Sequence, residues 1–138
     1  MTNKLLFFPI MGVLMLLSLA GATHAHHGIN AWYDMTKSVT LKGAVTSFEW
    51  TNPHSYIHID VKNEKGVIEN WSAEIGNIGM LSRYGWRRDT LKHGDQVTLI
   101  GNPARDDKPL MRLDKAVLAN GQELRTGDAI PVGSPRDN

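Results

Sequence analysis

Four of the six histidines form two close groups, His26 with His27 and His54 with His58. If export removes the chain up to Ala25, His26 becomes the first residue, and its α-amine and imidazole can chelate one ion together. Nitrogen donors in a planar arrangement suit Cu(II), which also stands above the other divalent first-row metals in affinity. The α-amine titrates near pH 7.7 to 8.0 in model peptides, roughly, so a metal displaces its proton easily. The residue types therefore predict a copper site that uses His26.

A third nitrogen donor is needed to complete a T-shaped set, and His54 and His58 are the candidates. Four residues at roughly 3.3 Å each place their backbones about 13 Å apart along a strand, so the two do not grip one ion as a pair. His54 is the better partner because it follows Pro53 at a loop edge. His27 offers a separate mode, in which the amine, a backbone nitrogen and its own imidazole chelate without the barrel.

A structural role is the alternative for these histidines. His26 and His27 would then be solvated residues left by cleavage. His54 would bond a backbone carbonyl to fix the Asn-Pro turn, and His58 would pack beside Tyr56 on the outer face of a strand.

The first 25 residues have the pattern of a secretory signal peptide. Lys4 precedes an uncharged, largely apolar run from Leu5 to Ala20, and small residues lead to Ala25. An uncleaved anchor is less favoured, because the run is shorter than the roughly 20 residues that span a bilayer and contains Pro9. We predict cleavage after Ala25 and a periplasmic location.

Composition narrows the function of the remaining 113 residues of a 138-residue chain. Cleavage removes Lys4, one of 15 basic residues, and no acid, so 14 basic residues balance 14 acidic ones. Such a chain lacks the charge of a nucleic-acid-binding protein. The absence of cysteine excludes disulfides, thiolate metal sites and thiol catalysis. The expected partner is a metal ion or a small ligand, with no nucleic acid and no membrane after cleavage.

Alternating apolar residues and turn clusters predict a mainly β domain over residues 38–126, between an irregular N-terminal arm at 26–37 and a disordered tail at 127–138. Gly43 predicts a bend or bulge, and a slip of apolar parity between Leu113 and Ala116 predicts a second bulge. Asn77 as N-cap and Gly85 as stop bound a short helix. The expected strands lie at residues 38–50, 54–62, 67–75, 96–101 and 111–118.

Three strands, one short helix and two more strands are the element order of a small five-stranded OB-like barrel, with the helix between strands three and four. A closed barrel also removes the exposed edges that an open sheet of this length would have. A small open β-sandwich is the alternative.

Several stretches of the chain form a recognisable set. They are the paired histidines with Gly28, the run W-T-N-P-H that ends at His54, and the segments VTLKGAVTSFE, IENWSAEIGNIGMLSRYGW and LKHGDQVTLIGNPARD. In these stretches the chain resembles one family of secreted bacterial proteins of unknown function, DUF6152. The resemblance covers nearly all of the mature chain. It implies secretion and a compact β domain, and it implies no reaction.

Catalytic motifs are absent: the chain has no nucleophile elbow, phosphate-binding loop, metalloprotease helix or dinucleotide fingerprint. We therefore expect a non-enzymatic protein. The spacing of Glu49, Asp60 and Glu74 does not select them over solvated strand positions. The competing hypothesis is a metal-free binding module that uses a barrel face around Trp50, Tyr56 and Trp86 for a small ligand or a protein partner, although the tryptophans fit the core better.

Overall fold

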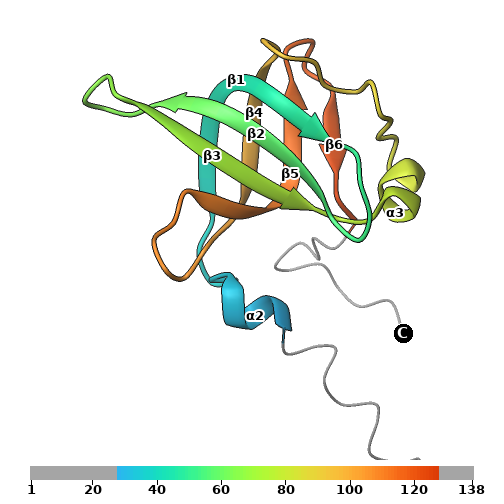
Figure 1. The fold of residues 1–138 in the computed structure, drawn as a ribbon, viewed down its shortest axis with the longest axis horizontal. Coiled ribbons are helices and arrows are strands. Elements are labelled where there is room, and N and C mark those ends of the chain that lie inside the picture. Colours follow the sequence, from blue (N-terminus) through green and yellow to red (C-terminus); the bar gives the residue numbers. More distant parts are fainter. Residues whose placement is uncertain (1–27, 128–138) are drawn as a thin grey trace, which may run out of the picture. The chain divides into compact units, whose positions relative to one another are not determined.

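Five strands close into a barrel in the computed structural model, which describes residues 28–127 (Figure 1). The sheet order β3-β2-β1-β4-β5 is closed by a short parallel pairing of β3 with β5, and β6 adds to the free side of β5. This arrangement confirms the predicted OB-like barrel. The strands are β1 (Val39–Glu49), β2 (Ser55–Lys62), β3 (Ile68–Ile75), β4 (Gln96–Pro103), β5 (Leu110–Leu118) and β6 (Glu123–Arg125).

The predicted helix is α3 (Ile78–Arg83), and it lies between β3 and β4 as expected. The Asn77 side chain accepts a hydrogen bond from the Met80 amide, which satisfies one of the free N–H groups of the first turn. Gly85 follows the helix with φ of 89°, a left-handed conformation that a residue without Cβ adopts freely. The sequence signals for both ends of this helix are confirmed.

Two short elements were not expected from the sequence. The arm at residues 26–37 was predicted to be irregular, but Gly28–Trp32 forms the helix α2. Similarly, β5 was predicted to be the last strand, but β6 follows it. The physical reason is length, since a five-residue turn and a three-residue strand are too short to produce a hydrophobic period.

The bulge predicted in β5 is confirmed, whereas β1 has its bulge at a residue other than Gly43. In β5 the register shifts opposite Ile100 and Gly101, so Asp114 is the extra residue, as the parity slip predicted. In β1 the shift falls at Thr46 and not at Gly43. Gly43 has a different role, because a Cβ there would lie 2.3 Å from the Asp60 carbonyl oxygen.

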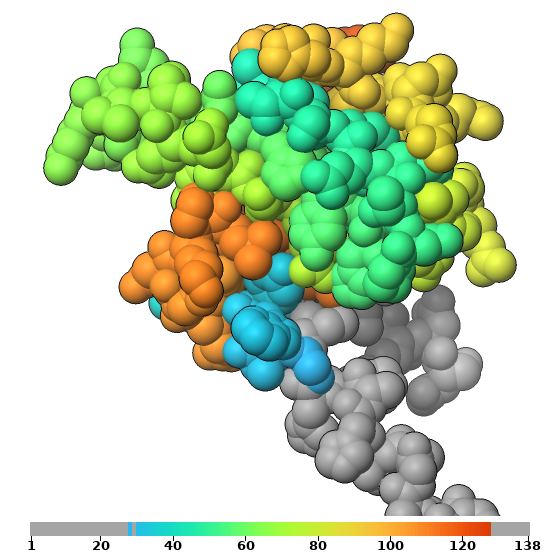
Figure 2. Space-filling model, in the orientation of Figure 1, coloured from blue at the N-terminus to red at the C-terminus, as the bar shows by residue number. Residues whose placement is uncertain are grey.

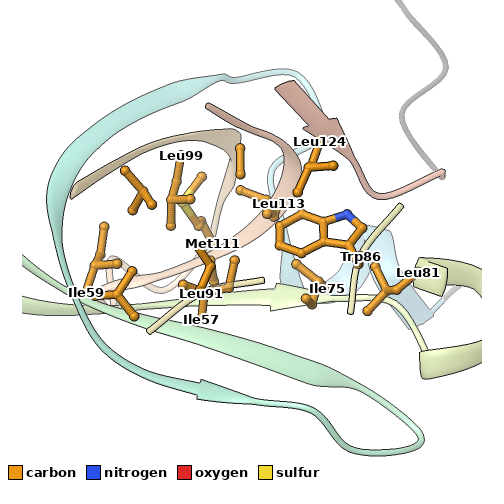
Figure 3. Packing of buried hydrophobic residues seen from close by; sticks show 14 residues of the cluster. Ile57, Ile59, Ile75, Leu81, Trp86, Leu91, Leu99, Met111, Leu113 and Leu124 are labelled. Carbon is orange, nitrogen blue, oxygen red and sulfur yellow. The ribbon is translucent and has the colours of Figure 1, made fainter. Parts of the chain in front are cut away.

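The core fills the barrel and extends toward α3 (Figure 3). The Trp86 indole is 1% exposed and donates a hydrogen bond to the Arg125 carbonyl at 2.8 Å, so its one polar group is satisfied. Leu81 of α3 is fully buried and lies near Trp86, which fixes α3 against the barrel. The other members of this hydrophobic core include Val45, Ile57, Ile59, Ala73, Ile75, Leu91, Val97, Leu99, Met111, Leu113, Ala116 and Leu124.

The segment before β1 is bonded to the end of β4 and to the first residue of the β4–β5 connection. Tyr33 forms an isolated bridge with Ala104, and the Asp34 amide donates to the Pro103 carbonyl at 2.9 Å. The Asn102 side chain donates to the Lys37 carbonyl at 2.7 Å. These bonds fix the buried Tyr33 ring against the barrel, which matters for the site described below.

Part of the predicted organisation lies outside the described residues: the leader at residues 1–25, His26, His27, and residues 128–138 of the tail. Within residues 28–127, no helix has the length and apolar character that crossing a membrane requires.

Candidate functional site

Strand pairing gathers polar side chains on one outer surface of β1, β2 and β3. Tyr56 of β2 lies between Glu49 of β1 and Glu74 of β3 in register, and in the next row His58 pairs with Ser72. Alternate residues of a strand share a face, so these five side chains form one polar surface, which we call the histidine face. The β1–β2 connection, drawn in teal, lies in the open on the side of the molecule shown in Figure 2.

The bulge at Thr46 places Glu49 on the histidine face. Val45 points into the core, and unbroken alternation would send Glu49 into the core as well. The extra residue reverses the phase, so Phe48 pairs with the buried Ile57 and packs against the core instead. One inserted residue therefore turns a carboxylate toward His58.

His54 lies at the edge of the histidine face and is held by a carboxylate that is mostly shielded from solvent. Its Nδ1 is bonded to Oε1 of Glu74, and the Tyr33 hydroxyl donates to Oε2 of Glu74 at 2.5 Å. The Glu74 side chain is 16% exposed, whereas the His54 side chain is 47% exposed. Glu74 thus links Tyr33, in the segment before β1, to an imidazole that is half exposed to solvent.

The loop that carries His54 is held by its own hydrogen bonds. The Thr51 hydroxyl donates to the His54 carbonyl at 2.9 Å, and the fully buried Ser55 hydroxyl donates to the Thr51 carbonyl at 2.9 Å. The Asn52 side chain accepts from the Ile78 amide of α3 at 3.0 Å. The loop is therefore attached at both sides, which limits where the His54 ring can point.

His58 sits within β2 and has both ring nitrogens engaged. Nδ1 lies 2.9 Å from the Ser72 hydroxyl oxygen, and Nε2 lies 3.0 Å from Oε1 of Glu49. The ring also stacks on Tyr56, with centroids 6.2 Å apart and planes at 19°. This is the packing on the outer face that the sequence offered as the alternative to metal binding.

Two tyrosines near the histidine face have a raised pKa, by burial first and by neighbouring glutamates second. Burial raises the pKa of Tyr33 strongly, and its hydrogen bond to Glu74 and the charge of Glu74 add to the shift. Burial also raises the pKa of Tyr56, followed by the charges of Glu74 and Glu49. Both hydroxyls therefore stay protonated at neutral pH and are available as hydrogen-bond donors.

The predicted metal ligands are separated by these contacts. His54 and His58 bond different carboxylates, so the structure does not bring them together, as expected from their spacing. Within residues 28–127, no three histidine or acidic side chains converge to hold a metal ion. His26 and His27, the first two predicted ligands, lie outside this range.

Sequence reasoning missed the two residues that hold His54. A signal existed for Glu74, because counting the hairpin register back from the turn at residues 63–66 places it opposite Tyr56, two residues after His54. Tyr33 gave no signal, since it is 41 residues from Glu74 and reaches it only through the closed barrel.

The aromatic surface considered for a metal-free module is not one surface. Trp86 is 1% exposed and belongs to the core, where its ring centroid lies 6.0 Å from that of Phe48. Trp50 is partly buried against the same core, and its ring contacts Phe48 edge-on. Of the three residues, only Tyr56 belongs to the histidine face, so the three do not form the single surface that the sequence suggested.

The turn histidine, His93, has a local role. Its Nδ1 lies 3.0 Å from the Thr46 carbonyl, which ties the turn before β4 to the bulge of β1.

Comparison with known proteins gives a family and no activity. No curated protein matches the chain. The sequence model of DUF6152, a family of unknown function, matches residues 13–111. The matched range includes both histidine groups, Tyr33 and Glu74, and it covers most of the chain. The chain therefore belongs to DUF6152.

Proposed function

We propose that this protein is exported to the periplasm, where it binds Cu(II) through the amine and imidazole of its mature first residue, His26, with His54 as the third nitrogen donor. The role is binding or carriage of the ion rather than catalysis. His27 offers the alternative chelate described above. The pattern of residues 1–25 supports export and cleavage after Ala25.

The observation that carries the proposal is the orientation of His54. Histidines that bind metals almost always donate their other ring N–H to a carboxylate or carbonyl, which fixes the tautomer and aims the free nitrogen. The bond from Nδ1 to Glu74 has this form, and the ring is half exposed. His58 lacks it, because Ser72 and Glu49 occupy both of its nitrogens, and the proposal therefore leaves His58 out.

The attachment of Tyr33 gives the proposal a second support. Tyr33 bonds the same Glu74 that orients His54. Glu74 therefore connects the proposed third ligand to the segment before β1, which is bonded to β4.

Titration of the untagged, exported protein with Cu(II) tests the proposal. Intact mass of the secreted product first establishes whether the chain begins at His26. We then expect submicromolar binding that His26→Ala abolishes, whereas His93→Ala, which removes a histidine bonded elsewhere, leaves it unchanged. Weak binding that is equal in wild type and His26→Ala would overturn the proposal and favour a metal-free binding module. A secreted chain that begins at a residue other than His26 would also overturn the proposal, because the α-amine of His26 would then not be free to bind the ion.

A further inference from the structure

The strand β3 is covered along only part of its outer edge. It pairs with β5 from Ser72 to Glu74, and the Pro109 carbonyl accepts from the Ser72 amide at 3.0 Å. Pro109 has no N–H with which to extend this pairing. Among the described residues, none pairs with β3 on this side before Ser72. Residues 68–71 therefore form a free strand edge, in the green hairpin that projects from the barrel (Figure 1).

The register of the hairpin identifies which backbone groups point out of this edge. In an antiparallel pair, residues alternate between bonding the partner strand and pointing away from it. Because the Ser72 amide points away from β2, the amides and carbonyls of Asn70 and Ile68 point away as well. The turn behind them is closed by the Asn63 amide, which donates to the Val67 carbonyl at 2.9 Å. A partner strand would therefore meet donors and acceptors that are already in place.

The two faces of this edge differ in chemistry, because successive side chains of a strand point to opposite faces. On one face the Ile68 side chain is 55% exposed. On the other face, Glu69 and Trp71 line a hollow of about 480 Å³ together with Asp107 and Pro109 of the β4–β5 connection. Both charged residues of this lining are acidic. An apolar side chain of a partner suits the first face, and a basic one suits the second.

Glu69 is held in place at the hollow. The Asn63 side-chain amide donates to its Oε1 at 2.8 Å, and the Trp71 indole N–H donates to its Oε2 at 3.3 Å. These bonds, that of Asn63 first, lower the pKa of Glu69. The carboxylate therefore keeps its charge at neutral pH, next to an indole ring whose face also attracts cations.

We propose that the free edge at residues 68–71 binds an extended segment of another protein in which apolar and basic residues alternate. Backbone hydrogen bonds to Ile68 and Asn70 add this segment to the sheet as a further strand, a known mode of peptide recognition. Its basic side chains lie toward Glu69 and Asp107, and its apolar side chains lie toward Ile68. The inference is independent of the proposed function.

A second copy of this chain suits the edge less well. Within residues 68–71, Ile68 and Asn70 carry the outward backbone groups, so two copies pair most fully with Ile68 of one opposite Asn70 of the other. This register places the two Glu69 side chains directly opposite each other, and like charges in that position are destabilising. The carboxylate therefore disfavours self-pairing and favours a basic partner.

Amide hydrogen exchange tests the inference. The probe is a short synthetic peptide of alternating valine and lysine with blocked ends, added to saturation to the untagged protein. We expect exchange at Ile68 and Asn70 to slow at least about tenfold, because their amides become bonded. The Glu69 amide already points toward β2 and should change little. A peptide that leaves the Ile68 and Asn70 amides unprotected would overturn the proposal.

The charge of the partner is tested with a second peptide of alternating valine and glutamate. We expect the wild type to bind the lysine peptide at least about tenfold more tightly, or by about 1.4 kcal/mol. Glu69→Lys should abolish this preference. The matched control, Glu64→Lys, makes the same charge change in the exposed turn of the hairpin and should keep it. Equal affinity of the wild type for the two peptides contradicts the proposed partner chemistry.

The strand edge itself is tested with Asn70→Pro. Proline removes an outward N–H and no bond to β2, so we expect the fold to persist and the affinity for the lysine peptide to fall at least about tenfold. If this variant folds poorly, the exchange measurement and the two charge variants still decide the question. A peptide-free protein that forms dimers in sedimentation and protects the Ile68 and Asn70 amides would overturn the proposal in favour of a second copy.

Discussion

Two histidines of the same hairpin each form a hydrogen bond with a glutamate, and they differ in how many ring nitrogens remain free of hydrogen bonds. His54 uses one nitrogen on a largely buried carboxylate, whereas His58 uses both nitrogens, one of them on an exposed carboxylate. The ring chemistry is the same in the two cases. The difference teaches that the side chains placed around each ring decide how many ring nitrogens a histidine on this face leaves free of hydrogen bonds.

The backbone explains the difference. His58 is paired within β2, where the opposite residue Ser72 reaches its ring directly. His54 precedes β2 in a loop held by Thr51 and Ser55, so the residue that reaches it is Glu74 from a neighbouring row. A loop residue can thus project outward, and its carboxylate partner further limits the orientation of its ring.

The largest effect is expected for copper binding when the two histidines are removed separately. His54→Ala removes the third nitrogen, and we expect the Cu(II) dissociation constant to rise about 100-fold, or about 2.8 kcal/mol. His58→Ala should leave it within about twofold. Competition titration measures both constants, and electron paramagnetic resonance counts the bound nitrogens. Equal losses in the two variants would remove the distinction between the rings.

Removing the Tyr33 hydroxyl should weaken the fold on the His54 side. Tyr33→Phe deletes a hydrogen bond to a carboxylate in a buried setting, so we expect the free energy of unfolding to fall by about 2 kcal/mol at pH 8. Urea denaturation measures the change. Tyr84→Phe is the matched control, because Tyr84 is 46% exposed and should give almost no change.

The same variant has a distinct pH dependence. The pKa of Tyr33 in the fold is raised above its ordinary value of 10.0, by burial first. Above pH 10 the unfolded chain therefore loses this proton while the folded chain keeps it, so the stability that Tyr33 contributes is present below pH 10 and is lost as the pH rises further. We expect the gap between wild type and Tyr33→Phe to shrink from pH 8 to pH 11. A constant gap would contradict the assignment.

A smaller effect is expected from Ser72→Ala on the His58 side. The variant removes the donor to Nδ1 of His58, and because that side chain is 30% exposed, water can replace the hydroxyl. We expect the free energy of unfolding to fall by about 1 kcal/mol in urea denaturation. A loss as large as that of Tyr33→Phe would mean that the hydrogen bond to His58 contributes as much to the free energy of unfolding as the hydrogen bond to Glu74 does.

The barrel could be predicted from the sequence because its signals are local. Alternation in five segments, the N-cap Asn77 and the parity slip beside Asp114 each express the conformation of neighbouring residues. Closure of five strands follows from the cost of exposed strand edges. In contrast, α2 and β6 are too short for a period, so no local pattern distinguishes them from loops.

The candidate site was predictable only in part, because its contacts are set by register and by closure. His54 was found by its residue type and by the loop around Pro53. Glu74 depends on the pairing of β2 with β3, and Glu49 on a bulge whose position at Thr46 the sequence misplaced at Gly43. Tyr33 depends on the complete barrel, because its bridge to Ala104 requires β4 to be in place. His26 and His27 remain predictions from the sequence.

The smallest change in the free energy of unfolding is expected for Glu49→Gln. Double-mutant cycles then compare the coupling energies of the two histidine–glutamate pairs. An exposed pair of this kind contributes little, since water and salt screen it, so we expect a change in stability below about 0.5 kcal/mol. A double-mutant cycle with His58→Ala should give a coupling energy in the same range. The corresponding cycle of Glu74→Gln with His54→Ala should give about 1 kcal/mol, because the carboxylate is shielded from water.

The two cycles differ in a second, independent respect. Raising the salt concentration to 0.5 M should weaken the coupling of Glu49 with His58, since water and ions reach this exposed pair freely. It should leave most of the coupling of Glu74 with His54, because the buried carboxylate is reached by few ions. Equal salt sensitivity of the two couplings would show that the lower exposure of Glu74 does not strengthen its interaction with His54.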